Sequence, residues 1–569
     1  MSPGSRPASV ITELDRILEP YGGLGAYARK DQVSHRYLSE EFRQLEQMAT
    51  IYPLIFLGVA VFLLQVVISR LIATEREEIA ILKAFGYYNR ALALHYLKLV
   101  LMIVGCGVGV GLLAGFWLGH HMSELYMDYY RFPFLLFTLK PGNLVFAVAV
   151  TLMAAAFGTG GALWRVVKLA PAVAMRPEPP AHYGLSWPER FGLITFFSQP
   201  TRMIMRNLGR RPLKAAFSVV GIALACAILM VGTVFQDAID YIVEIQFGLA
   251  QREDLTVTFV EPSAYRTLLS LQRLNGVAHG EPFRSVPVRL RFRQHSYRTA
   301  IVGSLADSSL HRLIDENLKP LAPPLAGIVL TDQLGLILDV KAGDTLTVEV
   351  LEGKRPQRLI PVAALSKEFI GVSAYMELGA LNRLMREDNL INGAYLAVDE
   401  LHLPGLYAAL NGMPRVAGTV ARRHAVTSFY ETMAEQMLIF TFFIIFFAGV
   451  IAFGVVYNSA RITLSERARE LASLRILGFR RYEVAYILLG ELLFLTLVAI
   501  PAGFLLGYAL CAYIIYYLQT DLYRIPLLIE PSTYAFAATV IILATLLSSA
   551  LVAWRIYHLD LISVLKIRE

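Results

Sequence analysis

The residues best suited to a specific interaction are an acid, a base and a glycine that recur in two short stretches. The first stretch is Glu78-Ile79-Ala80-Ile81-Leu82-Lys83-Ala84-Phe85-Gly86, and the second is Glu470-Leu471-Ala472-Ser473-Leu474-Arg475-Ile476-Leu477-Gly478. The two stretches agree at the acid, at the base and at the final glycine. An acid on a short helix can pair with a base of a partner protein. The chemistry indicated is therefore recognition.

A helix through either stretch would be amphipathic. Ile79, Leu82 and Phe85 share one stripe, and leucines repeat this pattern in the second copy. Such a helix can anchor its neighbours at the membrane interface, or it can dock its apolar stripe into a groove of a cytoplasmic partner. We favour docking, because an anchor does not need the same acid, base and glycine twice. The predicted docking residues are Glu78, Ile79, Leu82, Lys83, Phe85, Gly86, Glu470, Leu471, Leu474, Arg475, Leu477 and Gly478.

Common catalytic motifs are absent from the sequence. It contains no Gly-x-x-x-x-Gly-Lys-[Ser/Thr] phosphate loop, no His-Glu-x-x-His, no Gly-x-Ser-x-Gly and no Cys/His pair at zinc spacing. Cys106, Cys226 and Cys511 fall within apolar runs, where they suit packing. We therefore expect no catalytic, metal or cofactor site in this chain.

Composition indicates a membrane protein that crosses the bilayer several times. The chain has 569 residues, of which 56% are hydrophobic and only 17% are charged, and its mean hydropathy is +0.52. Soluble domains carry about 25% charged residues. The net charge of +7 gathers on segments expected to be cytoplasmic, so it indicates topology and not a nucleic-acid partner.

Seven apolar runs are long enough to cross a bilayer core of about 30 Å. They cover residues 51–69, 96–118, 144–163, 215–234, 437–456, 492–518 and 535–553. Basic residues flank both repeated stretches, so the positive-inside rule places these stretches in the cytoplasm. No run has an ionisable residue in its middle, which argues against an ion-coupled pump.

The predicted domains follow from the duplication. A three-helix unit at 51–170 is followed by a cytoplasmic linker with a basic juxtamembrane helix at 171–213 and an exit helix at 214–235. Residues 236–436 form an extracytoplasmic α+β domain, the ectodomain, because alternating strand patterns replace long apolar runs. A second three-helix unit occupies 437–569.

One predicted helix face consists of glycines. Gly107, Gly111, Gly115 and Gly119 recur every four residues, and Gly503 and Gly507 lie where Gly111 and Gly115 do in the second unit. Glycine is common in membrane helices, but a row in register favours close helix packing.

Three segments together resemble the FtsX-like permease family, the permeases of MacB- and Lol-type mechanotransmitting ABC transporters. They are the first repeated stretch, Met205-Arg206-Asn207-Leu208-Gly209-Arg210-Arg211-Pro212 before the exit helix, and Pro171-Ala172-Val173-Ala174-Met175-Arg176 after a third helix. The resemblance implies two units, each with an exit helix, an ectodomain like the MacB-like periplasmic core and three further helices. Residues 1–50 would be the C-terminal remnant of a first ectodomain, and the first unit would lack its exit helix.

The resemblance also implies a function. Both repeated stretches would be coupling helices seated on a separate cytoplasmic ABC ATPase, a homodimer that binds ATP and Mg. The chain would couple ATP hydrolysis to ectodomain motion and so move or extract a lipid, lipoprotein, peptide or hydrophobic compound. Alternatively, the ectodomain would act as a signalling switch for a partner such as a cell-wall hydrolase. Expected partners besides the ATPase are membrane lipid and an extracytoplasmic adaptor or cargo protein, and the expected location is the plasma (inner) membrane.

Overall fold

The computed structural model describes residues 7–21, 26–29, 32–168, 199–210, 212–315, 317–519 and 524–557. Within these residues, seven helices are long and apolar enough to cross a membrane, as the sequence predicts. The chain divides into two compact units, which are described separately. One unit holds the ectodomain, with residues 1–48, 234–441 and 512–530, and the other is helical, with residues 49–233, 442–511 and 531–569.

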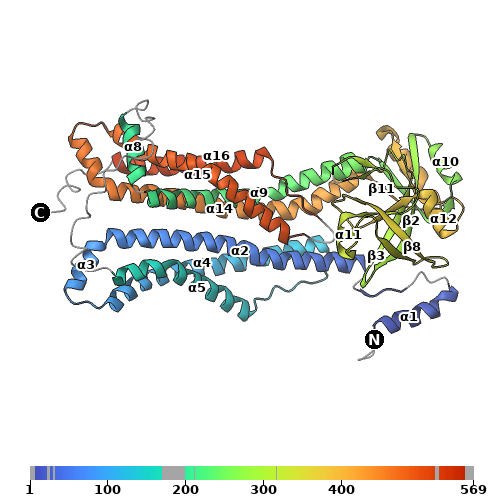
Figure 1. The fold of residues 1–569 in the computed structure, drawn as a ribbon, viewed down its shortest axis with the longest axis horizontal. Coiled ribbons are helices and arrows are strands. Elements are labelled where there is room, and N and C mark those ends of the chain that lie inside the picture. Colours follow the sequence, from blue (N-terminus) through green and yellow to red (C-terminus); the bar gives the residue numbers. More distant parts are fainter. Residues whose placement is uncertain are drawn as a thin grey trace. The chain divides into compact units, whose positions relative to one another are not determined.

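The first set of helices follows the order of the first predicted unit. It consists of α2 (Val33–Thr74), α3 (Arg76–Ala84), α4 (Asn89–Tyr130) and α5 (Pro141–Lys168) (Figure 1). Their shared core contains the buried side chains of Ile68, Ile72, Ile79, Leu92, Tyr96, Val100, Ala155 and Ala162. The short helix α3, which carries the first repeated stretch, is therefore part of this packed set.

The second set has the same order and includes one more membrane helix. It comprises α8 (Gln199–Arg210), α9 (Pro212–Val243), α14 (Arg422–Ile476), α15 (Arg481–Tyr517) and α16 (Pro531–Tyr557). The predicted basic helix before the exit helix is α8, while residues 171–198 of the predicted linker lie outside the described residues. Helix α14 has 55 residues, far more than the ~20 that cross a bilayer.

The ectodomain is built on a nine-stranded sheet in the order β11-β1-β10-β2-β3-β9-β6-β8-β7. The strands are β1 (Leu255–Ala264), β2 (Val277–Phe292), β3 (His295–Ser304), β6 (Ile328–Thr331), β7 (Thr345–Val350), β8 (Gln357–Ser366), β9 (Ala374–Glu377), β10 (Leu390–Val398) and β11 (Val416–Ala421). The remaining strands, β4 (Leu313–Ile314) and β5 (Pro320–Leu321), pair with each other. Short helices are α10 (Arg266–Gln272), α11 (Asp332–Leu338), α12 (Leu378–Met385) and α13 (Leu403–Asn411), and α1 (Pro7–Leu18) lies near the N-terminus. The predicted α+β ectodomain is confirmed.

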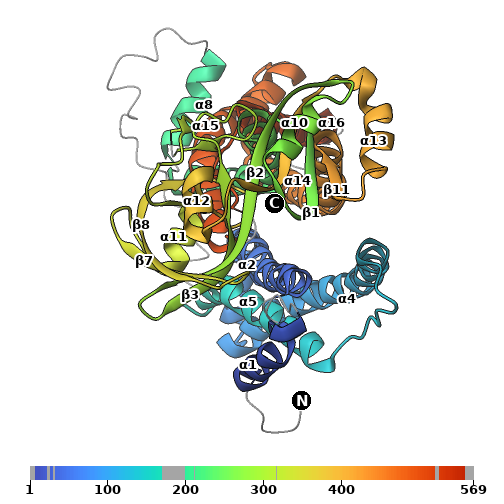
Figure 2. The ribbon, with the colours of Figure 1, turned by 90° about the vertical axis from the view of Figure 1, so that its right-hand side faces the viewer.

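Strand β2 belongs to both halves of this sheet. Its first half pairs with β10, and from Arg284 onward it pairs with β3. An additional pairing between β2 and β7 closes the ring β2-β3-β9-β6-β8-β7 into a small barrel. Figure 2 shows β2 as the long strand that crosses the domain between β1 and β3.

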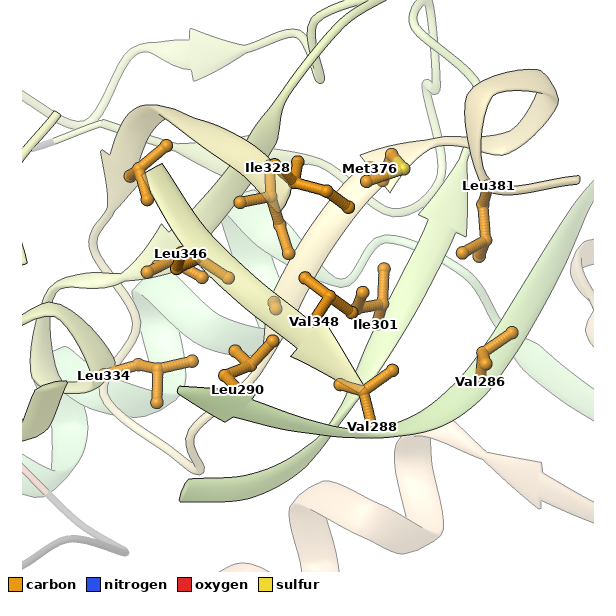
Figure 3. Close-up of a cluster of buried hydrophobic side chains, with 14 of the residues drawn as sticks. Val286, Val288, Leu290, Ile301, Ile328, Leu334, Leu346, Val348, Met376 and Leu381 are labelled. Carbon is orange, nitrogen blue, oxygen red and sulfur yellow. The ribbon is translucent and has the colours of Figure 1, made fainter. Parts of the chain in front are cut away.

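The barrel interior is filled by alternate side chains of its strands. Val286, Val288 and Leu290 point inward from β2 and are fully buried, because successive residues of a strand face opposite sides. They meet Leu346 and Val348 of β7, and Figure 3 shows this cluster of aliphatic side chains. The intervening residues face outward.

A buried arginine holds the two halves of the sheet together. Arg284 lies where β2 passes from one half into the other, and its side chain is fully buried. It pairs with Glu352 and with Glu387, the latter at 3.1 Å, and donates to the side-chain oxygen of Asn392 on β10. A buried charge requires such partners, since desolvation alone would cost several kcal/mol.

Arg284→Met should destabilise the ectodomain by about 3–5 kcal/mol, because two glutamates lose their buried counter-charge. Hydrogen–deuterium exchange of the full-length protein should show faster exchange of β2 and β10 amides. Arg289→Met is the matched control: Arg289 on β2 is 40% exposed and 3.6 Å from Glu349, and an exposed pair of this kind contributes only about 0–1 kcal/mol. Equal exchange in the two variants would contradict the assignment.

Candidate functional site

The first repeated stretch forms a helix of its own. Helix α2 ends at Thr74 and α3 begins at Arg76, so the chain changes direction at Glu75. The Glu75 carboxylate accepts a hydrogen bond of 2.5 Å from the Tyr96 hydroxyl of α4. This bond ties the start of α3 to the neighbouring helix.

Helix α3 divides its apolar side chains between the core and the surface. Ile79 and Ala80 are 1% and 0% exposed, whereas Ile81 and Leu82 are 42% and 38% exposed. Ile79 was expected on the docking stripe, and this is corrected because its side chain packs inside the helix set. Phe85 remains accessible, at 81% exposed.

The accessible apolar residues continue beyond the helix end. Tyr87 and Tyr88 are 57% and 82% exposed. With the exposed residues of α3 they form a surface that we call the α3 apolar surface, made of Ile81, Leu82, Phe85, Tyr87 and Tyr88. The predicted docking residue Glu78 is also exposed beside it.

Lys83 has a contact within its own helix set. Its ammonium group donates a 3.1 Å hydrogen bond to the carbonyl of Val167 near the C-terminal end of α5. Partial burial lowers the pKa of Lys83 below its ordinary value. A cation at a helix C-terminus is favourable, because the last carbonyl groups have no partner within the helix. The base of the first stretch thus helps to fix α3 against α5.

The final glycine of each stretch ends a helix. Gly86 and Gly478 have φ values of +92° and +96°, a region that side chains disfavour. At the first site, the amides of Gly86 and Tyr87 bond to the carbonyls of Lys83 and Leu82 at 3.0 and 3.1 Å. This left-handed ending lets the next membrane helix start within a few residues.

The second repeated stretch has a different local structure. It lies within α14, which runs without interruption from Arg422 to Ile476. The side chains of Glu470, Leu471, Leu474 and Arg475 lie outside the described residues. Ile476 and Leu477 are described and are 66% and 76% exposed. Only the end of this copy therefore presents a described apolar surface.

The predicted glycine rows of the two units also differ in how closely other helices approach them. A methyl group built on Gly503 would lie 2.6 Å from the Cβ of Cys226 on α9, and one on Gly507 would lie 2.4 Å from the Met230 sulfur. Among the described residues, no atom lies within 4 Å of such a methyl group on Gly107, Gly111 or Gly115. Gly119 approaches only the ring of Phe137.

The ectodomain is attached to its helices through Asp254 and Arg422. Helix α9 continues into a π-helix (Glu244–Ala250), and α14 begins directly after β11. Arg422 donates to the π-helix carbonyl of Phe247 and to the Asp254 carboxylate, each at 3.2 Å. The other Asp254 oxygen accepts from the Val398 amide of β10 at 3.0 Å. One aspartate therefore joins α9 and α14, which we call the stalk helices, to the sheet.

A loop from the second helix set also reaches the ectodomain base. The Arg524 amide donates to the carbonyl of Phe369 at 2.9 Å, and its guanidinium donates to that of Gly371 at 3.2 Å and pairs with Asp332. Burial lowers the pKa of Arg524 to about 10. The ring of Phe369 packs edge-on against Tyr241 of α9 at 5.7 Å. The loop after α15 and the helix α9 thus both contact the ectodomain loop that carries Phe369.

A cavity of about 440 Å³ lies beside the Arg422 contact. Apolar side chains and both signs of charge line it, including Phe247, Leu403, Val426, Arg423 and Glu400. Within the described part of the chain, no group of histidines, cysteines and acids is arranged to hold a metal ion.

Next to this junction the ectodomain buries a group of acids around one histidine. His311 stacks on the Tyr395 ring at 4.5 Å, and its Nδ1 lies 3.1 Å from Glu253. The nearby charges of Glu253, Glu368 and Glu281 raise the pKa of His311 against the opposing effect of burial. Burial raises the pKa of Glu368 from 4.5 to about 7, although Tyr375 and His311 oppose the shift. Burial by itself would raise the pKa of Glu281. Hydrogen bonds from Ser308, Ser309 and Leu310 outweigh this effect, so the pKa of Glu281 is lowered.

Sequence reasoning did not identify Asp254, Arg422, Arg524 or the partners of His311. The nearest signal was Arg422 itself, a base between a strand and a very long helix. Asp254 and Arg422 are far apart in the chain, and only strand pairing between β1 and β11 brings them together.

The ectodomain should lose stability as the pH rises from about 5 to about 8. In the folded state Glu368 keeps its proton up to about pH 7 instead of 4.5, and His311 keeps its proton above its ordinary range. The folded protein then binds more protons than the unfolded chain, so the free energy of unfolding falls with rising pH. Amide protection factors around residues 366–375, corrected for intrinsic exchange, measure this decline.

Glu368→Gln should flatten this pH dependence, because the amide does not titrate, whereas the exposed Glu261→Gln should leave it unchanged. The lowered pKa of Glu281 acts in a separate range, since its contribution is lost only as pH falls below 4.5. Protection that rises between about pH 5 and 8 would contradict the assignment.

Comparisons with known proteins identify the helical part. A model of the FtsX-like permease C-terminal domain matches twice, at residues 50–171 and 442–561. No curated protein matches the chain. Among solved structures, the chain is similar to the extracellular domain of the noncanonic ABC-type transporter YknZ from Gram-positive bacteria, with 9% identity, a TM-score of 0.21 and coverage of 27% of this chain and 87% of that one.

The periplasmic region of MacB from Actinobacillus actinomycetemcomitans is a second such structure, with 11% identity, a TM-score of 0.23 and coverage of 32% of this chain and 94% of that one. The two matches to the family model carry the assignment. Each match covers one copy of the repeated stretch and the three membrane helices around it. The chain is therefore a multi-pass membrane protein that carries two copies of the FtsX-like permease domain.

Proposed function

We propose that this permease couples ATP hydrolysis by a separate cytoplasmic ATPase to motion of its ectodomain. The observation that carries the proposal is the course of α14. This single helix starts at the end of strand β11, at Arg422, and continues to Ile476 within the second repeated stretch. A helix transmits displacement along its axis because each peptide group is bonded to the next turn.

The ATPase would bind at the repeated stretches. In the first copy, the α3 apolar surface supplies exposed apolar side chains, and Glu78 supplies a charge beside them. In the second copy, Ile476 and Leu477 are exposed at the matching end. Two similar surfaces suit a homodimeric ATPase, which would hold ATP and Mg itself. Apolar side chains in grooves and charges at the rim are common in such recognition.

The cargo would be a compound that reaches the outer face of the membrane, such as a lipid, lipoprotein, peptide or hydrophobic compound. The spans support this choice because they are uncharged in their middle. The plasma (inner) membrane is the location that such a partner ATPase requires. Lipid or peptide bound to the purified protein would support transport, whereas a bound envelope protein such as a cell-wall hydrolase would support a regulatory switch.

Combined substitution of Phe85→Glu and Leu477→Glu should abolish ATPase binding. Each buried apolar side chain of this size contributes about 1.5–3 kcal/mol, and a carboxylate in its place adds a desolvation cost. The measurement is the ATPase activity that co-purifies with the full-length protein from cells. Leu336→Glu is the control, because Leu336 on the ectodomain is 76% exposed, as Leu477 is. Undiminished co-purification would reject docking at the repeated stretches.

Arg422→Ala should separate ATP hydrolysis from ectodomain motion. It removes the side-chain bonds to Phe247 and Asp254 while leaving the repeated stretches unchanged. Spin-label distances between the ectodomain and α14, recorded with and without ATP, should then stop responding, although the bound ATPase stays active. Arg423→Ala is the matched control, since Arg423 is the exposed neighbour in the same helix turn. An unchanged response in Arg422→Ala would exclude this residue from transmission.

A further inference from the structure

The cavity of about 440 Å³ beside Arg422 lies where both stalk helices enter the ectodomain. Its walls come from the end of α9 and the following π-helix, from the first turns of α14, and from the segment that leads into α13. Ligand sites commonly have volumes of about 300–1,000 Å³ and lie where two parts of a protein meet. This cavity is at the small end of that range, so it suits a compact molecule or a single alkyl chain.

One part of the cavity lining is apolar. It consists of half-buried side chains from both stalk helices, the π-helix and α13, namely Val243, Phe247, Leu403 and Val426. The ring of Phe247 also packs against that of Phe429 on α14, with 6.2 Å between ring centroids, which fixes its orientation. Because these side chains are only partly covered, the apolar body of a ligand can bury further surface against them.

The charged part of the lining is unbalanced. It contains three carboxylates, of Glu244, Asp254 and Glu400, and two guanidinium groups, of Arg422 and Arg423, so its net charge is −1. Asp254 and Arg422 are bonded to each other at 3.2 Å. Glu244 and Glu400 are exposed, and within the described part of the chain neither carboxylate has a hydrogen bond or a salt bridge. A cation that enters the cavity therefore meets carboxylates with no competing partner, and such charge-assisted bonds are strong.

The position of the cavity along the stalk helices indicates that its ligand arrives from water. The apolar run of α9 ends at residue 234, and Glu244 follows it by about 15 Å of helix. On α14, Val426 precedes the apolar run that starts at residue 437 by about 16 Å. The head-group layer adds only about 5–8 Å to each side of the hydrocarbon core. A lipid that remains in the bilayer is therefore a poor occupant.

We propose that this cavity binds a water-soluble amphipathic cation with a single apolar chain. Its ammonium group would bond to Glu244 and Glu400, and its chain would lie on Phe247 and Val426. An anion is disfavoured by the net charge of the lining, and a neutral head group would leave the two carboxylates unused. The inference rests on the proposed function in one respect, because it names this class of compound as the cargo. Since both stalk helices line the cavity, their motion would change its shape.

The test measures photolabelling of the full-length protein in lipid nanodiscs, without an ATPase. The probe is dodecylammonium with a diazirine at the end of its chain, and mass spectrometry maps the adducts. We expect adducts within residues 243–254, 400–403 and 421–427, which include the lining. Unlabelled dodecylammonium should compete about tenfold better than dodecyl sulfate, because the two share a chain and differ in the sign of their charge.

Glu244→Gln with Glu400→Gln should weaken labelling of the cavity about fivefold to tenfold, because glutamine keeps the shape of each side chain and removes its charge. Glu261→Gln with Asp388→Asn is the matched control. It changes the net charge by the same amount at exposed ectodomain residues outside the lining. Ectodomain amide exchange verifies that both double variants are folded.

Equal labelling of the two double variants, equal competition by dodecyl sulfate, or adducts confined to the membrane spans would overturn the proposal. A two-chain phospholipid with a diazirine serves as a second probe. If it labels the cavity as strongly as dodecylammonium does, the occupant is bilayer lipid and the proposal is also overturned. A protein that is labelled at the cavity but binds no ATPase would reject the proposed coupling alone. One that binds the ATPase but is not labelled there would reject this site alone.

Discussion

The proposed mechanism depends on Asp254, because its two carboxylate oxygens contact a helix on one side and the sheet on the other. One carboxylate oxygen holds Arg422 at the start of α14, and the other holds the Val398 amide of β10. Arg422 in turn reaches the carbonyl of Phe247 in the π-helix that follows α9. The backbone geometry of a π-helix differs from that of the α-helix around it, and such segments are often found at functional sites. The ectodomain therefore meets its helices through charged and backbone groups and through a buried apolar cluster that includes Ile242, Ile245 and Phe369, with Tyr241 packed against it.

The ectodomain itself is suited to move as a body. The ring of strands from β2 to β7 encloses an aliphatic core, and Arg284 joins this ring to the rest of the sheet through buried charges. Interiors packed in this way deform little and transmit displacement. The cluster of His311 and Glu368 lies beside the helices α9 and α14, and its raised pKa values predict that the stability of this region depends on pH. Because the folded cluster binds protons more readily than the unfolded chain, lowering the pH raises the free energy of unfolding of this region. This holds at pH values above those at which Glu281 takes up a proton.

The duplication produced two domains whose surroundings have diverged. The first repeated stretch is a separate helix fixed by Glu75 and Lys83, while the second continues a long helix that reaches the ectodomain. Likewise Gly503 and Gly507 of α15 pack against α9, whereas among the described residues no atom lies within 4 Å of a methyl group built on Gly107, Gly111 or Gly115 of α4. The same motif therefore serves two structural contexts.

By itself, the sequence was sufficient to predict the seven spans, the α+β ectodomain between them and the two repeated stretches, each ending in a glycine. These features depend on local composition and periodicity, which any short window of residues reveals. Only the tertiary structure decided that Ile79 is buried, that Lys83 caps α5, and that Asp254 meets Arg422. Which face of a helix is covered, and which distant charges meet, depends on strand pairing and on neighbouring helices. These long-range contacts are not encoded in the residues immediately around a position.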